Sequence, residues 1–177
     1  DENMKNHNYE DCDSTKPNFK TVIEPALKKQ LINPKMKSKD IDGVFEVEKN
    51  CFEDYWSKDS FKKELTNDVA RYLVAKIGDK VVGYVGIWFV MDEGHITNVA
   101  VHSDYRGNKI GDKLVQALVE LCRNNNIISM TLEVRVSNTI AQNLYKKYGF
   151  KLAGIRKEYY SDNKEDAMIM WNDIKVV

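Results

Sequence analysis

The chain has 177 residues, and its 27 lysines and arginines balance its 27 aspartates and glutamates, so the formal charge is zero. A chain of this length suits one domain with a well-filled core, and the balanced charge argues against direct binding to nucleic acid or to an anionic membrane surface. No apolar run approaches the length of a membrane span, and the polar N-terminus does not resemble a signal peptide. We expect a cytoplasmic globular protein, without a membrane partner, that is a monomer or a weak dimer.

The first 35 residues differ in composition from the rest. Residues 1–20 are rich in Asn, Asp and Lys, so they cannot bury enough apolar surface to offset their ordering entropy. Residues 21–34 are more apolar and either dock as a short helix or serve as a linker. We therefore divide the chain into a polar, partly disordered extension or linker (1–35) and a folded domain (36–177). The extension could cover a cleft, bind a partner or have no role, and composition alone predicts that its removal leaves activity intact.

The periodicity of apolar residues predicts alternating helices and strands. In chain order, we predict helices over 41–52 and 57–65, two strands within 71–90, a strand over 95–101, a helix that ends near 123, a strand over 128–136, a helix over 137–150, and strands over 151–160 and 165–173. Ser57 is the expected N-cap of the second helix, and Gly78-Asp79 is the expected turn between the first two strands. This order predicts a mixed α/β sheet.

A basic turn that contains glycine, Arg106 to Gly111, separates the strand over 95–101 from the following helix. The first N–H groups of a helix have no intrahelical partner and carry partial positive charge, so anions bind there readily. Arg106 would add a fixed cation, and the two glycines would let the backbone approach a ligand closely. A phosphate or pyrophosphate fits this chemistry, although a basic turn at a helix start is usually just a capped, solvated turn.

Several other sites are excluded by spacing. The chain lacks both the Walker phosphate loop and the Gly-x-Gly-x-x-Gly dinucleotide fingerprint. Its three cysteines, Cys12, Cys51 and Cys122, are too widely spaced for a disulfide framework or a paired-cysteine zinc site, so we expect reduced thiols. His95 and His102 have no partner spaced for metal binding or a catalytic triad. We therefore expect both to be structural and the protein to hold no metal.

The basic turn resembles the acetyl-CoA loop of the GNAT acetyltransferase superfamily, Arg/Gln-x-x-Gly-x-Gly/Ala between a strand and a helix. The run Arg106-Gly107-Asn108-Lys109-Ile110-Gly111 matches at the first and last positions, and Lys109 stands where the family usually has its middle glycine. The resemblance implies that these residues hold acetyl-CoA as a co-substrate. Lys109 either weakens that contact, adopts a torsion that costs a non-glycine residue energy, or reaches a phosphate of the cofactor.

A second GNAT signature, Asn-x-x-Ala-x-x-Leu-Tyr-x-x-x-Gly-Phe, is matched at Asn138, Ala141, Leu144, Tyr145, Gly149 and Phe150. The runs CFEDYWS, LEVRVSN, YY and EDAMIM resemble the RimI type, which acetylates the first residue of a ribosomal protein. Together these matches span about residues 35–171. The resemblance implies the α/β GNAT fold, with a mixed, mostly antiparallel central sheet flanked by helices and strands that splay at the acetyl-CoA site.

The resemblance also implies roles for individual residues. Glu133 would be the base that takes a proton from the attacking amine, directly or through water, and Tyr145 the acid or hydrogen-bond donor for the CoA sulfur. Asn138 would help to hold CoA. The alternatives are a solvated Glu133, a core Tyr145 and an Asn138 that only caps its helix. The backbone of the strand would also contact the cofactor at Val99, Ala100 and Val101.

The acceptor site is predicted from aromatic residues. Phe52, Tyr55 and Trp56 would form one wall of a slot for a peptide N-terminus, and Tyr159 or Tyr160 the other. Adjacent residues on one strand point to opposite faces, and we expect Tyr159 to face the slot. The candidate acceptor contacts are Phe52, Tyr55, Asn98 and Tyr159.

Three functions are compatible with the sequence. The first is N-terminal α-acetylation of a protein such as a ribosomal protein. The second keeps the fold but uses a lysine or a small-molecule amine as acceptor, since fold does not fix substrate. The third is a non-catalytic module that binds CoA or a partner, for which Lys109 is the one supporting feature.

Overall fold

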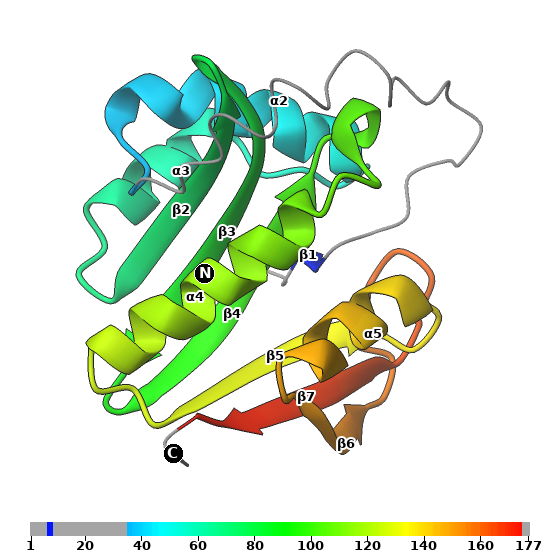
Figure 1. The fold of residues 1–177 in the computed structure, drawn as a ribbon. Coiled ribbons are helices and arrows are strands. Elements are labelled where there is room, and N and C mark those ends of the chain that lie inside the picture. Colours follow the sequence, from blue (N-terminus) through cyan, green and yellow to red (C-terminus); the bar gives the residue numbers. More distant parts are fainter. Residues whose placement is uncertain (1–6, 9–34, 175–177) are drawn as a thin grey trace.

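The computed structural model describes residues 7–8 and 35–174 (Figure 1), so the predictions for residues 9–34, Cys12 included, lie outside the described residues. The elements are β1 (His7–Asn8), η1 (Ser38–Asp40), α2 (Ile41–Cys51), α3 (Lys58–Leu65), β2 (Ala70–Ile77), β3 (Lys80–Val90), β4 (Glu93–Val101), η2 (Ser103–Tyr105), α4 (Ile110–Asn124), β5 (Ser129–Arg135), α5 (Thr139–Lys147), β6 (Lys151–Arg156) and β7 (Ala167–Asp173). No helix in this part of the chain combines the length and apolar character needed to cross a bilayer.

The strands form one mixed sheet, in the order β2-β3-β4-β5-β7-β6, with β1 paired to β4 beside this path. The β4–β5 and β1–β4 pairs are parallel, and the other pairs are antiparallel. Helices α4 and α5 cover one face, while α2 and α3 cover the other (Figure 1). The predicted mixed, mostly antiparallel sheet flanked by helices is therefore confirmed.

Local patterns account for most element boundaries. Ser57 caps α3 by accepting a hydrogen bond from the Ser60 N–H, and Gly149 follows α5 with a φ of 98°. Two strand predictions were too long, because the strand predicted over 151–160 ends at Arg156 and the strand predicted over 128–136 ends at Arg135. Tyr159 and Tyr160 therefore lie in the turn after β6, and the rule of alternating faces does not apply to them.

The sheet opens between β4 and β5. These strands pair only from Glu93 to His95 on β4, opposite Ser129 to Thr131 on β5. Just beyond, the register of β4 against β3 shifts, because Ile96 pairs with Ile87 while Asn98 pairs with Gly86. Thr97 is thus the extra residue of a β-bulge, which bends β4 where its pairing with β5 ends.

The loop from β4 to α4 depends on two residues with positive φ. Gly107 has a φ of 76°, and Lys109, the N-cap of α4, is left-handed with a φ of 61° and a ψ of 24°. Lysine lacks glycine's freedom in this region, which costs roughly 1 kcal/mol. Lys109 therefore adopts the backbone conformation for which a glycine would be suited, and the loop begins α4 without one.

Replacing Lys109 with glycine should therefore cost almost nothing. Relief of the left-handed strain offsets the greater entropy of glycine in the unfolded chain, so the free energy of unfolding should change by less than about 0.5 kcal/mol. The matched control is Lys113→Gly, an exposed residue one turn into α4, which should lose about 1 kcal/mol. Urea denaturation of both variants measures the difference. Equal losses would contradict the left-handed conformation of Lys109.

Candidate active site

A pocket of about 360 Å³ lies between the β4–α4 loop and α5. It is lined by Val101, Tyr105, Arg106, Gly107, Lys109, Ile110, Gly111, Asp112, Ile140 and Leu144. Six of the predicted cofactor residues are among these, and they surround the N-terminus of α4 with its free N–H groups. Ile140 and Leu144 were not predicted as pocket residues, although their spacing of four on α5 places them on one face of that helix.

Arg106 lines this pocket but is anchored beneath it. Its Nε donates to the Val101 carbonyl over 3.1 Å, and its guanidinium also contacts the Cys51 sulfur at 3.5 Å. The expected fixed cation is thus also a side chain that ties the end of β4 to α2. Asn108 has a similar bracing role, since its amide nitrogen donates to the carbonyls of Tyr105 and Arg106. Arg106, the N-terminus of α4 and Lys109 all place positive charge along the lining of this pocket.

Glu133 and His95 form a hydrogen-bonded carboxylate–imidazole pair where β4 and β5 diverge. The His95 Nε2 and a Glu133 carboxylate oxygen are 2.8 Å apart, and an Arg156 nitrogen lies 3.8 Å from the other oxygen. The side chain of Glu133 is only 5% exposed, whereas that of His95 is 33% exposed. Sequence spacing offered His95 no partner for a metal site or a triad, and the structure gives it Glu133 as a hydrogen-bond partner. The buried carboxylate orients the imidazole, and the imidazole is the member of the pair that reaches solvent.

Residues of β5 alternate between the two faces of the sheet, and this explains the placement of Glu133. Leu132 and Val134 are fully buried against the α4 side of the sheet, so Glu133 faces the other side. The pattern ends with the strand at Arg135, since Val136 lies beyond it and is 40% exposed. His95 is the last β4 residue paired to β5, opposite Thr131. The pair therefore bridges the two strands where they begin to diverge.

Tyr145 and Asn138 lie on α5. Tyr145 is fully buried, with its ring 5.8 Å from that of Phe150. Asn138 caps the helix, because its Oδ1 accepts a hydrogen bond from the Ala141 N–H over 3.1 Å. The Asn138 amide nitrogen is buried and has no hydrogen-bond partner among the described residues. Asn138 thus caps α5, and neither N–H donor of its amide has a partner among the described residues.

Asp112 fixes α5 against the start of α4. Its carboxylate accepts hydrogen bonds from the Lys147 ammonium and the Tyr148 hydroxyl. Burial alone would raise the pKa of Asp112, but these two donors outweigh burial and hold the pKa below its usual range. Burial and the Asp112 carboxylate together raise the pKa of Tyr148 to about 12. This contact sets the position of the helix that carries Tyr145.

The aromatic residues predicted for the acceptor slot differ in how far they are buried. Phe52 and Trp56 belong to the core between α2, α3 and the sheet, so they do not form an open wall. Tyr55 is 48% exposed and packs edge-on against Phe45. Tyr159 is half-buried, and its ring lies 5.1 Å from that of Tyr160, which is buried. Tyr55 and Tyr159 are thus the two predicted acceptor residues with surface available to a ligand.

Asn98 lies inside a buried polar network on the α2–α3 side of β4. Its Oδ1 accepts from the Tyr72 hydroxyl over 3.2 Å, and its amide nitrogen donates to the Tyr84 hydroxyl over 3.4 Å. Burial raises the pKa of both tyrosines well above the usual value, and the carboxylate of Glu64 raises that of Tyr72 further while that of Glu48 raises that of Tyr84. Asn98 is fully buried, and the expectation that it faces an open acceptor slot is wrong.

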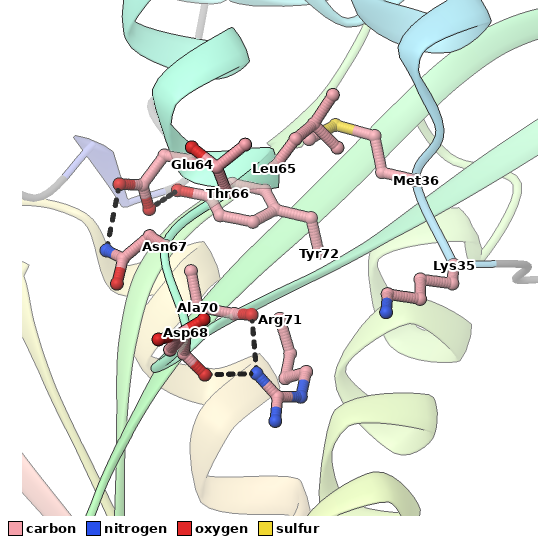
Figure 2. A pocket seen from close by; sticks show the side chains of 10 residues that line it. All are labelled: Lys35, Met36, Glu64, Leu65, Thr66, Asn67, Asp68, Ala70, Arg71 and Tyr72. Carbon is pink, nitrogen blue, oxygen red and sulfur yellow. Dashed lines mark hydrogen bonds between the residues drawn. The ribbon is translucent and has the colours of Figure 1, made fainter.

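A second pocket, of about 280 Å³, lies on the α3–β2 side and shares no lining residue with the first (Figure 2). In it, the Glu64 carboxylate accepts from the Tyr72 hydroxyl over 2.9 Å and from the Asn67 amide over 3.3 Å. The Trp88 indole adds a third hydrogen bond to Glu64. Because its carboxylate is engaged by three donors, Glu64 braces α3 against the sheet, and we assign no ligand to this pocket. In the described part of the chain, no cluster of three His, Cys, Asp or Glu side chains is placed to hold a metal ion.

Comparisons with known proteins agree with this geometry. The family described as "Acetyltransferase (GNAT) family" matches residues 41–150. A Bacillus subtilis protein, provisionally named as a ribosomal protein bS18-alanine N-acetyltransferase, is 50% identical over 137 residues, which cover 77% of this chain and 91% of that protein. The Escherichia coli K12 protein named as the same enzyme is 31% identical over 139 residues, or 76% of this chain and 92% of its own length.

The fold comparison gives the same result. The crystal structure of the ribosomal-protein-S18-alanine N-acetyltransferase from Escherichia coli superposes with a TM-score of 0.77 at 27% identity. The match covers 84% of this chain and 96% of that one. With a family match across residues 41–150 and a relative that is 50% identical, the chain belongs to the GNAT acetyltransferase family.

Proposed function

We propose that this enzyme transfers the acetyl group of acetyl-CoA to the α-amine at the N-terminus of a protein, with ribosomal protein bS18 as the first candidate acceptor. The observation that carries the proposal is the contact between Glu133 and His95 where β4 and β5 part. An α-amine, with a pKa near 8, is largely protonated at neutral pH and must lose a proton before it attacks a thioester. A carboxylate–imidazole pair at this point can accept that proton.

The pocket beside α4 fits the phosphates of acetyl-CoA. The N-terminus of α4 offers free N–H groups, Gly107 lets the backbone approach, and Lys109 stands exposed at the rim. Along β4, the side chains of Val99 and Ala100 are buried in opposite cores, so only their backbone groups can serve a ligand. The proposed binding mode therefore combines the loop at the end of β4 with the backbone edge of that strand.

Proton removal from the amine is assigned to the Glu133–His95 pair. The amine nitrogen forms a bond to the thioester carbon, the carbon–sulfur bond breaks, and the nitrogen loses one proton. We assign that proton to the imidazole of His95, because His95 is the exposed member of the pair. Glu133, whose carboxylate oxygen lies 2.8 Å from the His95 Nε2, holds the imidazole in place for this transfer.

Tyr145 is assigned to the leaving group. The departing thiolate must gain one proton, which balances the proton lost by the amine. The side chain of Tyr145 projects from α5 into the hydrophobic core. Helix α5 is in turn fixed to α4 through Asp112, which lines the cofactor pocket. Its hydroxyl is therefore proposed as the donor to the sulfur.

The α-amine is favoured over a lysine or small amine by the names and coverage of the relatives. Both named relatives carry the bS18 alanine acceptor in their names, and the matches cover 91% and 92% of their lengths. The alternative of a non-catalytic module loses its one supporting feature, because Lys109 adopts the left-handed conformation and the loop still leads into α4. We therefore keep lysine and small amines only as outcomes of the acceptor test.

A peptide assay tests the acceptor and the Glu133 carboxylate of the Glu133–His95 pair together. CoA release is measured with acetyl-CoA and a short peptide that begins with Ala and contains one internal Lys, with its N-terminus either free or capped. We expect turnover with the free peptide and none with the capped one. Glu133→Gln keeps the size of the side chain but removes its charge, so kcat should fall by about 10²- to 10³-fold while the KM for acetyl-CoA stays within a factor of about two.

The matched control is Glu120→Gln on the exposed side of α4, which should leave kcat unchanged. Equal turnover with the capped peptide would assign the acceptor to lysine instead. A Glu133→Gln variant with wild-type kcat would remove Glu133 from the mechanism.

Two tyrosines near the end of α5 provide a second test. Tyr145→Phe should lower kcat by about 10- to 100-fold with little loss of stability, because the ring stays packed against Phe150. Tyr148→Phe should show the reverse: stability falls by about 1 kcal/mol because the hydrogen bond to Asp112 is lost, and kcat falls by less than about twofold because Lys147 still pairs with Asp112 and holds α5. Steady-state kinetics and urea denaturation are measured on both. If Tyr145→Phe retained full kcat, Tyr145 would not be the proton donor.

A further inference from the structure

The backbone edge of β4 beyond His95 already carries a strand from the N-terminal part of the same chain. Strand β1 pairs with β4 in parallel, with His7 opposite Asn98 and Asn8 opposite Val99. The other edge of β4 is occupied by β3, since Gly86 pairs with Asn98 and Val85 with Val99. A strand has only two edges, so β1 must lie on the edge that β5 uses from Glu93 to His95.

Figure 1 shows β1 at the point where β4 and β5 diverge. The bulge at Thr97 precedes this point, and no other described strand pairs with β4 on this edge beyond His95. Two residues of extended chain cover about 7 Å of the edge. They therefore span the part of β4 next to the Glu133–His95 pair and stop before the loop that begins α4.

We propose that the His7–Asn8 strand competes with acetyl-CoA for the backbone edge of β4 and thereby acts as an intramolecular inhibitor of this enzyme. The inference rests on the proposed binding of acetyl-CoA along this edge, and it does not depend on which amine is the acceptor. The N–H and C=O groups of one strand edge can pair with only one neighbour at a time, because a paired chain lies only about 4.8 Å away. A bound cofactor arm and β1 therefore exclude each other at Val99.

Competition within one chain has two consequences. The inhibition is independent of protein concentration, because inhibitor and site belong to the same molecule. By thermodynamic linkage, the pairing of β1 lowers the affinity for CoA by the same factor by which bound CoA lowers the equilibrium constant for β1 pairing. Under this proposal, removal of the N-terminal segment raises the affinity for CoA, whereas composition alone predicts no effect on activity.

Substitutions that affect only backbone pairing test the proposal in the full chain. In a parallel pair, successive residues direct their N–H groups to opposite sides, so His7→Pro and Asn8→Pro are combined to remove whichever N–H faces β4. The control combines His7→Ala and Asn8→Ala, which removes the same side chains but keeps both N–H groups. Calorimetric titration with CoA alone, without acceptor, gives the dissociation constant of each protein.

The double proline variant should bind CoA about 3- to 10-fold more tightly than wild type, which corresponds to β1 occupying the edge in roughly two thirds to nine tenths of molecules. The double alanine variant should bind like wild type. Equal affinity of the proline variant and wild type would overturn the proposal, and so would an equal gain in the alanine variant. Absence of CoA binding in all three proteins would overturn it together with the proposed function.

Limited trypsin digestion of the first 34 residues tests the linkage in the opposite direction. Saturating CoA should accelerate cleavage in wild type and have little effect in the double proline variant, since only wild type has a paired strand to release. Cleavage of wild type that CoA slows or leaves unchanged would contradict the proposal. Neither measurement uses the acceptor, so failure of the peptide assay with a gain in CoA affinity would reject the proposed acceptor alone.

Discussion

Backbone pairing along β4 is the constraint on which the site depends. This strand shares its edge with β5 only as far as His95, and the bulge at Thr97 then bends it away. The divergence has three effects at once. It lets His95 reach across to Glu133, it frees the N–H and C=O groups of the following residues, and it directs the end of β4 into the loop that begins α4. A β4 paired to β5 along its whole length would have none of these features.

An opened strand needs support from its other side, and the buried network behind β4 supplies it. Glu48 and Glu64 are almost fully buried, which is costly for carboxylates unless each oxygen is paired. Glu48 accepts from the Tyr84 hydroxyl and the Trp56 backbone, and Glu64 accepts from three side chains. These contacts join α2 and α3 to the sheet. The edge of β4 can therefore be free of β5 and still be fixed in space.

Features fixed by local pattern could be predicted from the sequence, and features fixed by tertiary neighbours could not. The alternation around Glu133, the Ser57 cap and the order of elements follow from periods of two and 3.6 residues. The Glu133–His95 contact joins residues 38 positions apart, and it requires the strand order, which no local period contains. The inward turn of Arg106 depends likewise on Cys51 of a distant helix. Lys109 departs from the family pattern in residue type but not in backbone conformation.

The same constraint explains why a strand edge that binds a ligand attracts other chains. Backbone N–H and C=O groups that lack a partner must be satisfied by water, by a ligand or by another strand. An enzyme that binds its co-substrate through a strand edge must leave that edge without a neighbouring strand such as β5. Any extended segment nearby can then pair with the same edge. Pairing of His7 and Asn8 with Asn98 and Val99 is one such solution. Because it uses backbone groups, it demands little of the sequence of the segment, and composition gave no sign of it.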